Sequence, residues 1–335
     1  MEQRNPNGDR AYRAVFFDLD GTLLPMDVEE FMGAYMKKLG AFFAQRGVDP
    51  QQFGAAMKAG IKAMAHHSGD ITNDQAFFKA FYECVDEGER DWMAQFMEFY
   101  ETEFPSIGDT VTPNPAAARA VEALAAKGYT LVLTTMPMFP LVAVQARLKW
   151  AGVDPALFSR ITSFENSASI KPNLTYYAEN LAATGLAGRD VLMVGNNTVE
   201  DLAALDMGTD AYLVTDFLID AVDYDLATVK HGSLADFAAW AEALPSCAEP
   251  AAHVETDAVS WPRVEKAYGA NVLIRRSAAE MQRLAASAYS VNADGVPTTA
   301  KRPSGPAPAA SRPAAPAPAR PAAPEIARPS SPKEA

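Results

Sequence analysis

The stretch AVFFDLDGTLLP, residues 14–25, decides the fold of this chain. Its first four residues are apolar and lead directly into Asp18, and Asp20 follows two positions later, just before a glycine. A short apolar run that ends at a turn signal is typical of a strand buried on both faces. Open α/β sheets bind their ligands at the carboxyl ends of such strands. The stretch therefore predicts a buried strand that presents two carboxylates at a ligand-binding edge.

Helical patterns follow this strand over residues 27–108. Asp27 is suited to cap a helix that begins at Val28, because its carboxylate can accept hydrogen bonds from the first free backbone amides. Apolar residues recur at helical spacing in three further segments, which we predict to be helices at about 50–66, from residue 73 on, and at about 89–103. We therefore predict that residues 27–108 form a helical insertion between the first strand and the rest of the sheet.

From residue 113 on, helical and strand patterns alternate. Helices are predicted at 115–127, 141–150, 173–183, 200–207 and 234–244, and strands at 129–134, 160–164, 190–194 and 211–214. Strands that alternate with helices indicate a parallel, doubly wound sheet. The predicted fold class is therefore α/β, with a Rossmann-like doubly wound parallel sheet formed by residues 12–26 and 109–245 and an inserted α-helical domain.

The C-terminal part of the chain differs in composition from the rest. We predict that residues 246–295 form an extension that is partly helical, with a loop at 246–260 and an amphipathic helix within 262–289. Residues 296–335 are rich in Pro, Ala and Ser, and such a segment buries too little apolar surface to offset its chain entropy. We predict that this tail is disordered.

Composition and charge argue against several classes of function. A net charge of −13 and a pI near 4.8 argue against a broad nucleic-acid-binding surface. We expect no membrane span, since no run of about 18 apolar residues occurs, and no secretory signal, since the N-terminus lacks an apolar run. Cys84 and Cys247, the two cysteines, show no disulfide or metal-site spacing, which fits a reducing compartment. We expect a cytoplasmic protein, and the sequence leaves its oligomeric state open.

Two carboxylates at one strand end suit phosphoryl transfer. One can attack phosphorus to give an aspartyl-phosphate, while the other protonates the leaving oxygen and later activates water. A divalent cation is needed to neutralise charge between carboxylates and phosphate, and Mg²⁺ suits oxygen ligands. One alternative is an Asp-Gly turn that only closes the strand. Another is a calcium loop, which is disfavoured because Leu23 stands where that loop needs a glycine.

FFDLDGTLL at 16–24 resembles the first motif of the haloacid dehalogenase (HAD) superfamily, and three later segments resemble its other motifs in the same order. These segments are LVLTT at 131–135, Lys171-Pro172, and VGNNTVED at 194–201. The helical insertion directly after the first motif resembles the C1-type cap of this superfamily. The resemblance covers about residues 14–220 and implies a HAD-like core with a helical cap.

The resemblance implies a Mg²⁺-dependent phosphatase that acts on a small phosphorylated metabolite through an aspartyl-phosphate. It assigns Asp18 as the nucleophile and Asp20 as the general acid and base. It also implies that Lys171 and Thr135, with Thr134 as the alternative, hold the phosphoryl group. The implied Mg²⁺ ligands are Asp18, the backbone carbonyl of Asp20, and either Asp201 or Asn196.

The last motif departs from the family pattern, because Asn196 and Asn197 stand where the family commonly has an aspartate. Glu200 is expected on a helix surface. Two alternatives to the phosphatase stay open: a phosphomutase of the same superfamily, and a non-catalytic HAD-like protein that binds a phosphorylated ligand or a partner. The dehalogenase reaction is disfavoured, because those enzymes use one aspartate without a metal, whereas Asp20 is the phosphatase-type residue.

Overall fold

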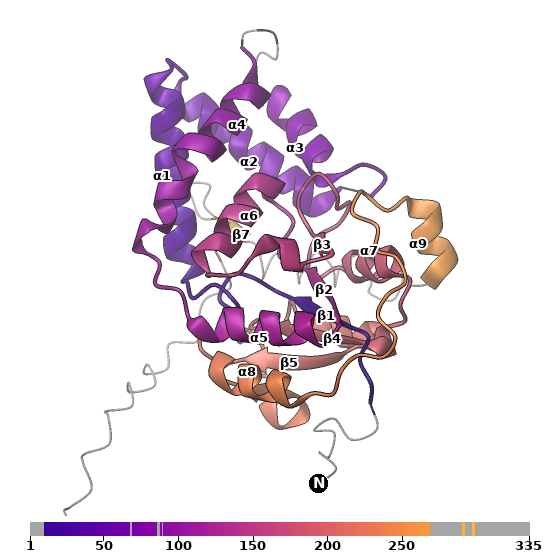
Figure 1. Cartoon of the computed structure of the whole chain (residues 1–335). Coiled ribbons are helices and arrows are strands. Elements are labelled where there is room, and N and C mark those ends of the chain that lie inside the picture. Colours follow the sequence, from indigo (N-terminus) through magenta and orange to yellow (C-terminus); the bar gives the residue numbers. More distant parts are fainter. Residues whose placement is uncertain are drawn as a thin grey trace, which may run out of the picture. The chain divides into compact units, whose positions relative to one another are not determined.

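β1 (Ala14–Phe17) lies in the middle of a six-stranded sheet in the computed structural model of the chain (Figure 1). The structure describes residues 10–67, 69–85, 88, 90–268, 290–291 and 297–298. The other strands are β2 (Thr130–Leu133), β3 (Arg160–Ile161), β4 (Val191–Gly195), β5 (Asp210–Val214) and β6 (Lys230–Gly232). All neighbouring strands are parallel, and their order is β3-β2-β1-β4-β5-β6. The predicted doubly wound α/β fold is confirmed.

The strand order reverses between β1 and β4, and ligands of such sheets bind in the crevice at this switch point. The backbone N–H of Asp18 donates to the carbonyl oxygen of Val194 at 2.8 Å. This bond holds the carboxyl ends of β1 and β4 side by side. The segments that carry Asp18 and Asn196 therefore begin at the same point of the sheet.

Helices cover both faces of the sheet. Side chains alternate between the two faces along a strand, so Val15 and Phe17 pack with α5 (Pro115–Ala126) and α8 (Leu234–Ala243), while Ala14 and Phe16 pack with α7 (Leu174–Thr184). All four β1 residues are buried. This two-sided burial explains why the strand is a continuous apolar run in the sequence.

The four α-helices between β1 and η1 (Phe104–Thr110) in the chain are called the inserted helices here (Figure 1). They are α1 (Val28–Gln45), α2 (Pro50–His66), α3 (Asn73–Tyr82) and α4 (Trp92–Thr102). The carboxylate of Asp27 accepts hydrogen bonds from the amides of Glu29 and Glu30, as predicted for the start of α1. Aromatic rings pack their interior; for example, the Phe81 ring lies 5.1 Å from that of Trp92.

Asn73, at the start of α3, is fully buried and forms hydrogen bonds to the segments that follow β2 and β3. Its backbone N–H donates to the Ser167 carbonyl at 2.8 Å. Its side-chain amide donates to the carbonyl oxygens of Pro137 at 2.9 Å and Ser169 at 3.2 Å. The inserted helices are thus hydrogen-bonded to the α/β core as well as packed on it.

Two elements differ from the predictions. β6 was not predicted, because KHG offers no β-branched or aromatic side chain and the strand pairs with β5 through its backbone. The segment predicted as a helix over 200–207 is a 3₁₀-helix, η4 (Leu202–Met207), after a turn. The Asn197 side chain accepts from the amides of Val199 and Glu200, and this local bond holds the turn in place of a helical start.

The remaining helices are α6 (Leu141–Trp150), α9 (Trp261–Tyr268) and the 3₁₀-helices η1 (Phe104–Thr110), η2 (Pro155–Leu157), η3 (Gly188–Asp190) and η5 (Leu226–Thr228). The predicted loop over 246–260 is confirmed, and the buried Arg160 binds it by donating to the carbonyls of Glu255 and Asp257 at 2.7 and 2.9 Å. Of the helix predicted within 262–289, residues 262–268 lie in α9 and the rest lies outside the described residues.

The predicted disordered tail, 296–335, also lies outside the described residues except for β8 (Pro297–Thr298). β8 pairs antiparallel with β7 (Ser290–Val291), and the disorder of the tail stays a prediction. The β-branched Val291 and Thr298 favour extended backbone. Among the residues that the structure describes, we find no helix that is both long and apolar enough to cross a membrane.

Candidate active site

Lys171 binds two of the predicted site carboxylates at once. Its ammonium lies 2.7 Å from Asp18 Oδ1 and 2.7 Å from Asp201 Oδ1. All three side chains are buried, and that of Lys171 has no exposed surface. The structure therefore brings together residues from three separate segments of the chain, after β1, before α7 and after β4.

Mutual attraction keeps this cluster charged despite its burial. Burial alone would lower the pKa of Lys171, but the Asp18 and Asp201 carboxylates outweigh it and raise that pKa well above its usual range. Burial raises the pKa of Asp201 to about 6, against the opposing pull of Lys171. The attraction between Lys171 and the two acidic groups thus offsets the cost of burying its ammonium.

Asp201 has both carboxylate oxygens engaged. Its Oδ1 binds Lys171, and its Oδ2 accepts the backbone amides of Asn196 and Asn197, both at 2.9 Å. Asp201 thus orients Lys171 and the turn after β4. Glu200, expected on a helix surface, instead lies in this turn, is half-buried and lines the pocket. Burial raises the pKa of Glu200 to about 8.

The two candidate threonines have different surroundings. The Thr134 hydroxyl is buried and donates to the Phe17 carbonyl at 3.2 Å, so it bonds the end of β2 to the end of β1. The Thr135 hydroxyl lines the pocket, is buried and has no hydrogen-bond partner among the described residues. The Thr135 carbonyl accepts from the hydroxyls of Thr162 and Tyr176 at 3.1 and 2.7 Å. Thr135 is therefore the threonine that can donate to a bound ligand.

Asp20 pairs with Arg147 of α6, a residue that the sequence did not single out. Arg147 is buried, and its guanidinium lies 4.6 Å from the centre of the Phe139 ring. Burial raises the pKa of Asp20, which Asp18 reinforces and Arg147 opposes. Asp20 Oδ1 and two guanidinium nitrogens of Arg147 have no hydrogen-bond partner among the described residues. A buried arginine on a predicted helix was the available signal, but only the fold shows what it faces.

The predicted Mg²⁺ ligands differ in how well they fit a metal. Thr22 Oγ1 lies 2.9 Å from Asp18 Oδ2 and 3.1 Å from Asn196 Oδ1. Asp18 Oδ2 and Asn196 Oδ1 are therefore neighbours around the Thr22 hydroxyl, and Mg²⁺ is typically bound by few protein oxygens together with water and substrate phosphate. Asp201 accepts three hydrogen bonds, against two for Asp18 and one for Asn196 Oδ1, so its oxygens have the least capacity left for a metal. Within the described part of the chain, no group of three or more His, Cys, Asp and Glu side chains is arranged to hold a metal.

A family model described as haloacid dehalogenase-like hydrolase matches residues 12–207, more than half of the chain. The chain belongs to the haloacid dehalogenase-like hydrolases. Membership confirms the superfamily expected from the first motif, and it identifies the chain as a hydrolase with a small-molecule substrate.

Solved structures of HAD-like proteins match the chain at low sequence identity. One is a predicted phosphoglycolate phosphatase from Haemophilus somnus 129pt, with 20% identity over 68% of this chain and 97% of that chain and a TM-score of 0.42. Another is the 2-haloacid dehalogenase from Pseudomonas syringae pv. Tomato DC3000, with 19% identity over 68% and 97% and a TM-score of 0.47. Such similarity assigns no activity. No curated protein matches the sequence.

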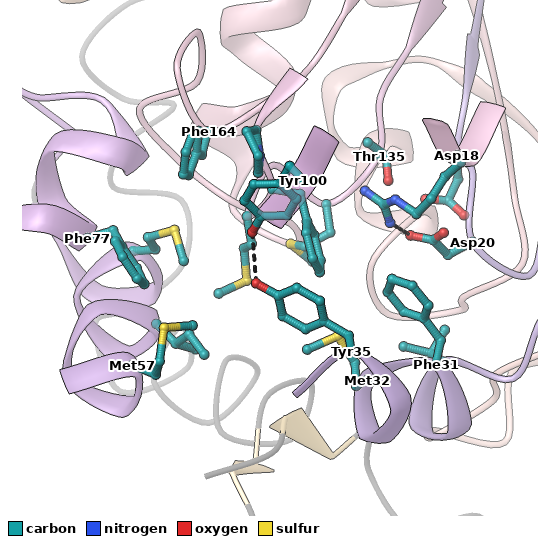
Figure 2. Close-up of a pocket in the computed structure, with 18 of the residues that line it drawn as sticks. Asp18, Asp20, Phe31, Met32, Tyr35, Met57, Phe77, Tyr100, Thr135 and Phe164 are labelled. Atoms are coloured by element: carbon teal, nitrogen blue, oxygen red, sulfur yellow. Dashed lines mark hydrogen bonds and ion pairs between the residues drawn. The ribbon is translucent and has the colours of Figure 1, made fainter. Parts of the chain in front are cut away.

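The site of this HAD-like hydrolase opens into a pocket of about 110 Å³. Figure 2 shows Asp18, Asp20 and Thr135 on one side of the pocket and Met57 and Phe77 on the other. The Asp18 end is built from segments that follow the strands, whereas the far side is built from the inserted helices. The pocket therefore has a polar end on the core and an apolar wall on the inserted helices.

Proposed function

We propose that this hydrolase is a Mg²⁺-dependent phosphohydrolase that forms an aspartyl-phosphate on Asp18. The observation that carries the proposal is that Asp18, Asp20 and Thr135 line one pocket while Lys171 binds Asp18. This set supplies a nucleophile, a second carboxyl and two donors for phosphoryl oxygens. The inserted helices, within residues 27–108, are proposed to act as the cap over this site.

The first step is attack of a carboxylate oxygen of Asp18 on phosphorus. Asp18 Oδ1 accepts from Lys171 and Oδ2 from Thr22, so the carboxylate is oriented through both oxygens. The bond between phosphorus and the ester oxygen breaks, and Asp20 in its acid form gives that oxygen a proton. In the second step Asp20, now a carboxylate, takes a proton from water that attacks phosphorus. The bond from phosphorus to Asp18 breaks, and phosphate leaves.

Lys171 and Thr135 are proposed to stabilise the phosphoryl group during both steps. Phosphoryl transfer needs positioning and neutralisation of charge on the equatorial oxygens more than covalent help. The ammonium of Lys171 is a compact charge suited to phosphate. The unpartnered Thr135 hydroxyl is free to donate, and Lys171 is proposed to act from its position beside Asp18.

Asp18, Asn196 and the backbone carbonyl of Asp20 are proposed to hold Mg²⁺, with Asp201 orienting Lys171. The cation would neutralise charge between the Asp18 carboxylate and the phosphate. Asn196 supplies a neutral oxygen where an aspartate would add a negative charge. The protein ligands then carry one formal charge, that of Asp18, and we expect a weaker affinity for Mg²⁺ than an all-carboxylate site gives.

The test is hydrolysis of 4-nitrophenyl phosphate by the purified chain with and without Mg²⁺. Asp18→Asn removes the nucleophile, and we expect kcat/KM to fall at least about 10³-fold. Asp49→Asn is the matched control, because Asp49 is an exposed cap of α2 and asparagine caps a helix equally well. We expect it to retain full activity.

The outcomes separate the competing reactions. Mg²⁺-dependent phosphate release that is lost in Asp18→Asn supports the proposal. Equal rates for the wild type and Asp18→Asn, on this ester and on sugar and nucleotide phosphates, would overturn it. Halide release from 2-chloropropionate that depends on Asp18, without phosphate release from any ester, would replace it with dehalogenation. Transfer of phosphate to a second sugar hydroxyl, in place of release to water, would replace it with a mutase.

A further inference from the structure

The wall that the inserted helices give to the pocket carries no charge. Its described residues are apolar or tyrosine, and they include Met57, Ile61, Met64, Phe77, Phe78 and Phe96. The ionisable side chains that line the pocket lie on the core, at Asp18, Asp20, Arg147 and Glu200. A pocket built in this way binds an organic group by burying apolar surface.

The position of Asp20 decides which part of a substrate meets this wall. Asp20 is the proposed acid for the leaving oxygen, and its partner Arg147 lies 5.7 Å from the centre of the Phe31 ring of α1. In Figure 2 Phe31 lies beside Asp20, and Met57 and Phe77 lie further from it. A phosphate held at Asp18 therefore leaves its organic part to face the apolar side chains.

One polar pair interrupts the apolar wall. The hydroxyls of Tyr35 and Tyr100 lie 2.8 Å apart, between the two sides of the pocket (Figure 2). Each hydroxyl already has the other as its partner. Burial raises the pKa of Tyr35 to about 12, so the pair is uncharged at neutral pH. The pair leaves most hydroxyls of a sugar or a nucleotide without a partner in this part of the pocket, and an unpaired buried hydroxyl weakens binding.

The size of the pocket limits the organic group. Its volume of about 110 Å³ is somewhat below the roughly 150 Å³ of an engineered apolar cavity that holds benzene. Because the same volume, lined also by Asp18 and Asp20, has to hold the phosphate, a group of about one six-membered ring is the upper size. The several methionines in the wall, such as Met57 and Met64, are flexible and polarizable and can adapt to different shapes.

From this wall and its place beside Asp20, we infer that the substrate is a phosphate monoester of an apolar alcohol whose organic part is no larger than about one ring. The inference rests on the phosphohydrolase function proposed above. Sugar phosphates and nucleotides are excluded as preferred substrates, because the wall gives their hydroxyl groups too few partners. The inserted helices then select substrates by shape and apolar surface.

A matched pair of esters tests the inference. Cyclohexylmethyl phosphate and glucose 6-phosphate both place a six-membered ring one carbon from the ester oxygen, but only the sugar carries hydroxyls. We expect kcat/KM to be at least about 10²-fold higher for cyclohexylmethyl phosphate, since apolar pockets discriminate against added hydroxyls by about this factor. The assay uses the full chain with saturating Mg²⁺ and measures phosphate release.

A variant in the wall tests whether the ring contacts the inserted helices. Met57→Gln keeps the side-chain length but adds an amide, and we expect the ratio of kcat/KM for cyclohexylmethyl phosphate to that for methyl phosphate to fall about tenfold. The matched control is Lys58→Gln, at the next, exposed position of α2, for which we expect the ratio of the wild type. Calorimetric titration of cyclohexylmethyl phosphate into Asp18→Asn measures binding without turnover.

The failures of the two proposals are distinguishable. Turnover that depends on Asp18 but is equal or faster for glucose 6-phosphate overturns the substrate class and leaves the phosphohydrolase standing. An unchanged ratio in Met57→Gln, with Asp18→Asn binding both esters equally, also overturns the substrate class alone. No Asp18-dependent phosphate release from any ester overturns the phosphohydrolase, and the substrate class falls with it.

Discussion

The two sides of the pocket are stabilised in opposite ways. On the core side, Lys171 lies buried between Asp18 and Asp201, and each charge depends on its partner, since an unpaired buried charge is strongly unfavourable. On the side of the inserted helices, rings such as Phe81 and Phe77 pack without charges, and each ring contacts several others. The comparison teaches that the chemistry depends on a few matched groups, whereas the shape of the wall depends on a larger and more replaceable set.

Lys171→Met breaks the core side and has the largest expected effect. It leaves Asp18 and Asp201 facing each other without a cation, and we expect a loss of about 3–5 kcal/mol in the free energy of unfolding together with loss of turnover. Urea unfolding measures the first and phosphate release the second. Lys58→Met, on an exposed helix face, is the control and should be near neutral.

The same variant has a predicted pH dependence. Without Lys171 the pKa of Asp201 rises further above its unfolded value of about 3.9, since burial raises it and Lys171 no longer opposes this. Between the unfolded and the folded pKa of Asp201, the folded state binds more protons than the unfolded state. Its stability therefore falls as the pH rises between these two values. We expect a larger deficit at pH 8 than at pH 5. An equal deficit at both would show that the carboxylates are not the cause.

Asp20→Asn tests the chemistry without removing the nucleophile. Asparagine keeps the shape of the side chain but cannot supply a proton, and we expect kcat/KM for an alkyl phosphate to fall about 10³-fold. The fall should be smaller for 4-nitrophenyl phosphate, whose leaving group needs little protonation. Equal falls for both esters would contradict the assignment of Asp20 as the acid.

Phe81→Ala tests the packing between the inserted helices. Phe81 has no exposed surface and does not line the pocket, so its loss leaves a cavity and should lower the free energy of unfolding by at least about 3 kcal/mol. We expect kcat/KM at low temperature to change little. Denaturant unfolding and initial rates on the same preparation separate the two effects. A loss of activity larger than the loss of folded protein would show that the wall is less independent of the site than we argue.

Tyr100→Phe has the smallest expected effect. It removes the hydroxyl that Tyr35 binds, and we expect a loss of about 1 kcal/mol in the free energy of unfolding. A double-mutant cycle with Tyr35→Phe isolates the pair. If the two single changes and the double change are additive, the hydrogen bond contributes nothing.

Most of the fold could be predicted because its signals are local. The apolar run of β1, the cap at Asp27 and the alternation after residue 113 each report on their own segment. β6 could not be predicted, since its backbone pairs with β5 while KHG carries no strand pattern. The η4 segment was predicted with the wrong type of helix, because a side-chain bond from Asn197 fixes the turn before it.

The candidate site was partly predictable, for a related reason. Asp18 and Asp20 could be predicted because they come directly after an apolar run typical of a buried strand. Thr135 and Lys171 could be predicted from the order of the motifs. Arg147 could not be found this way, since its partner Asp20 is 127 positions away and only the fold joins them. The choice between Thr134 and Thr135 also required the structure, because both residues follow β2 and only Thr135 lines the pocket.

Asn73 links α3 to the two segments that carry Thr135 and Lys171. Its amide bonds reach carbonyls two positions after Thr135 and two positions before Lys171, at Pro137 and Ser169. Lifting α3 away from the core must break these bonds and the one to Ser167, so it disturbs both segments that are proposed to grip the phosphate. A movement of α3 relative to the core would therefore reach Thr135 and Lys171 through these bonds, although Asn73 touches neither residue.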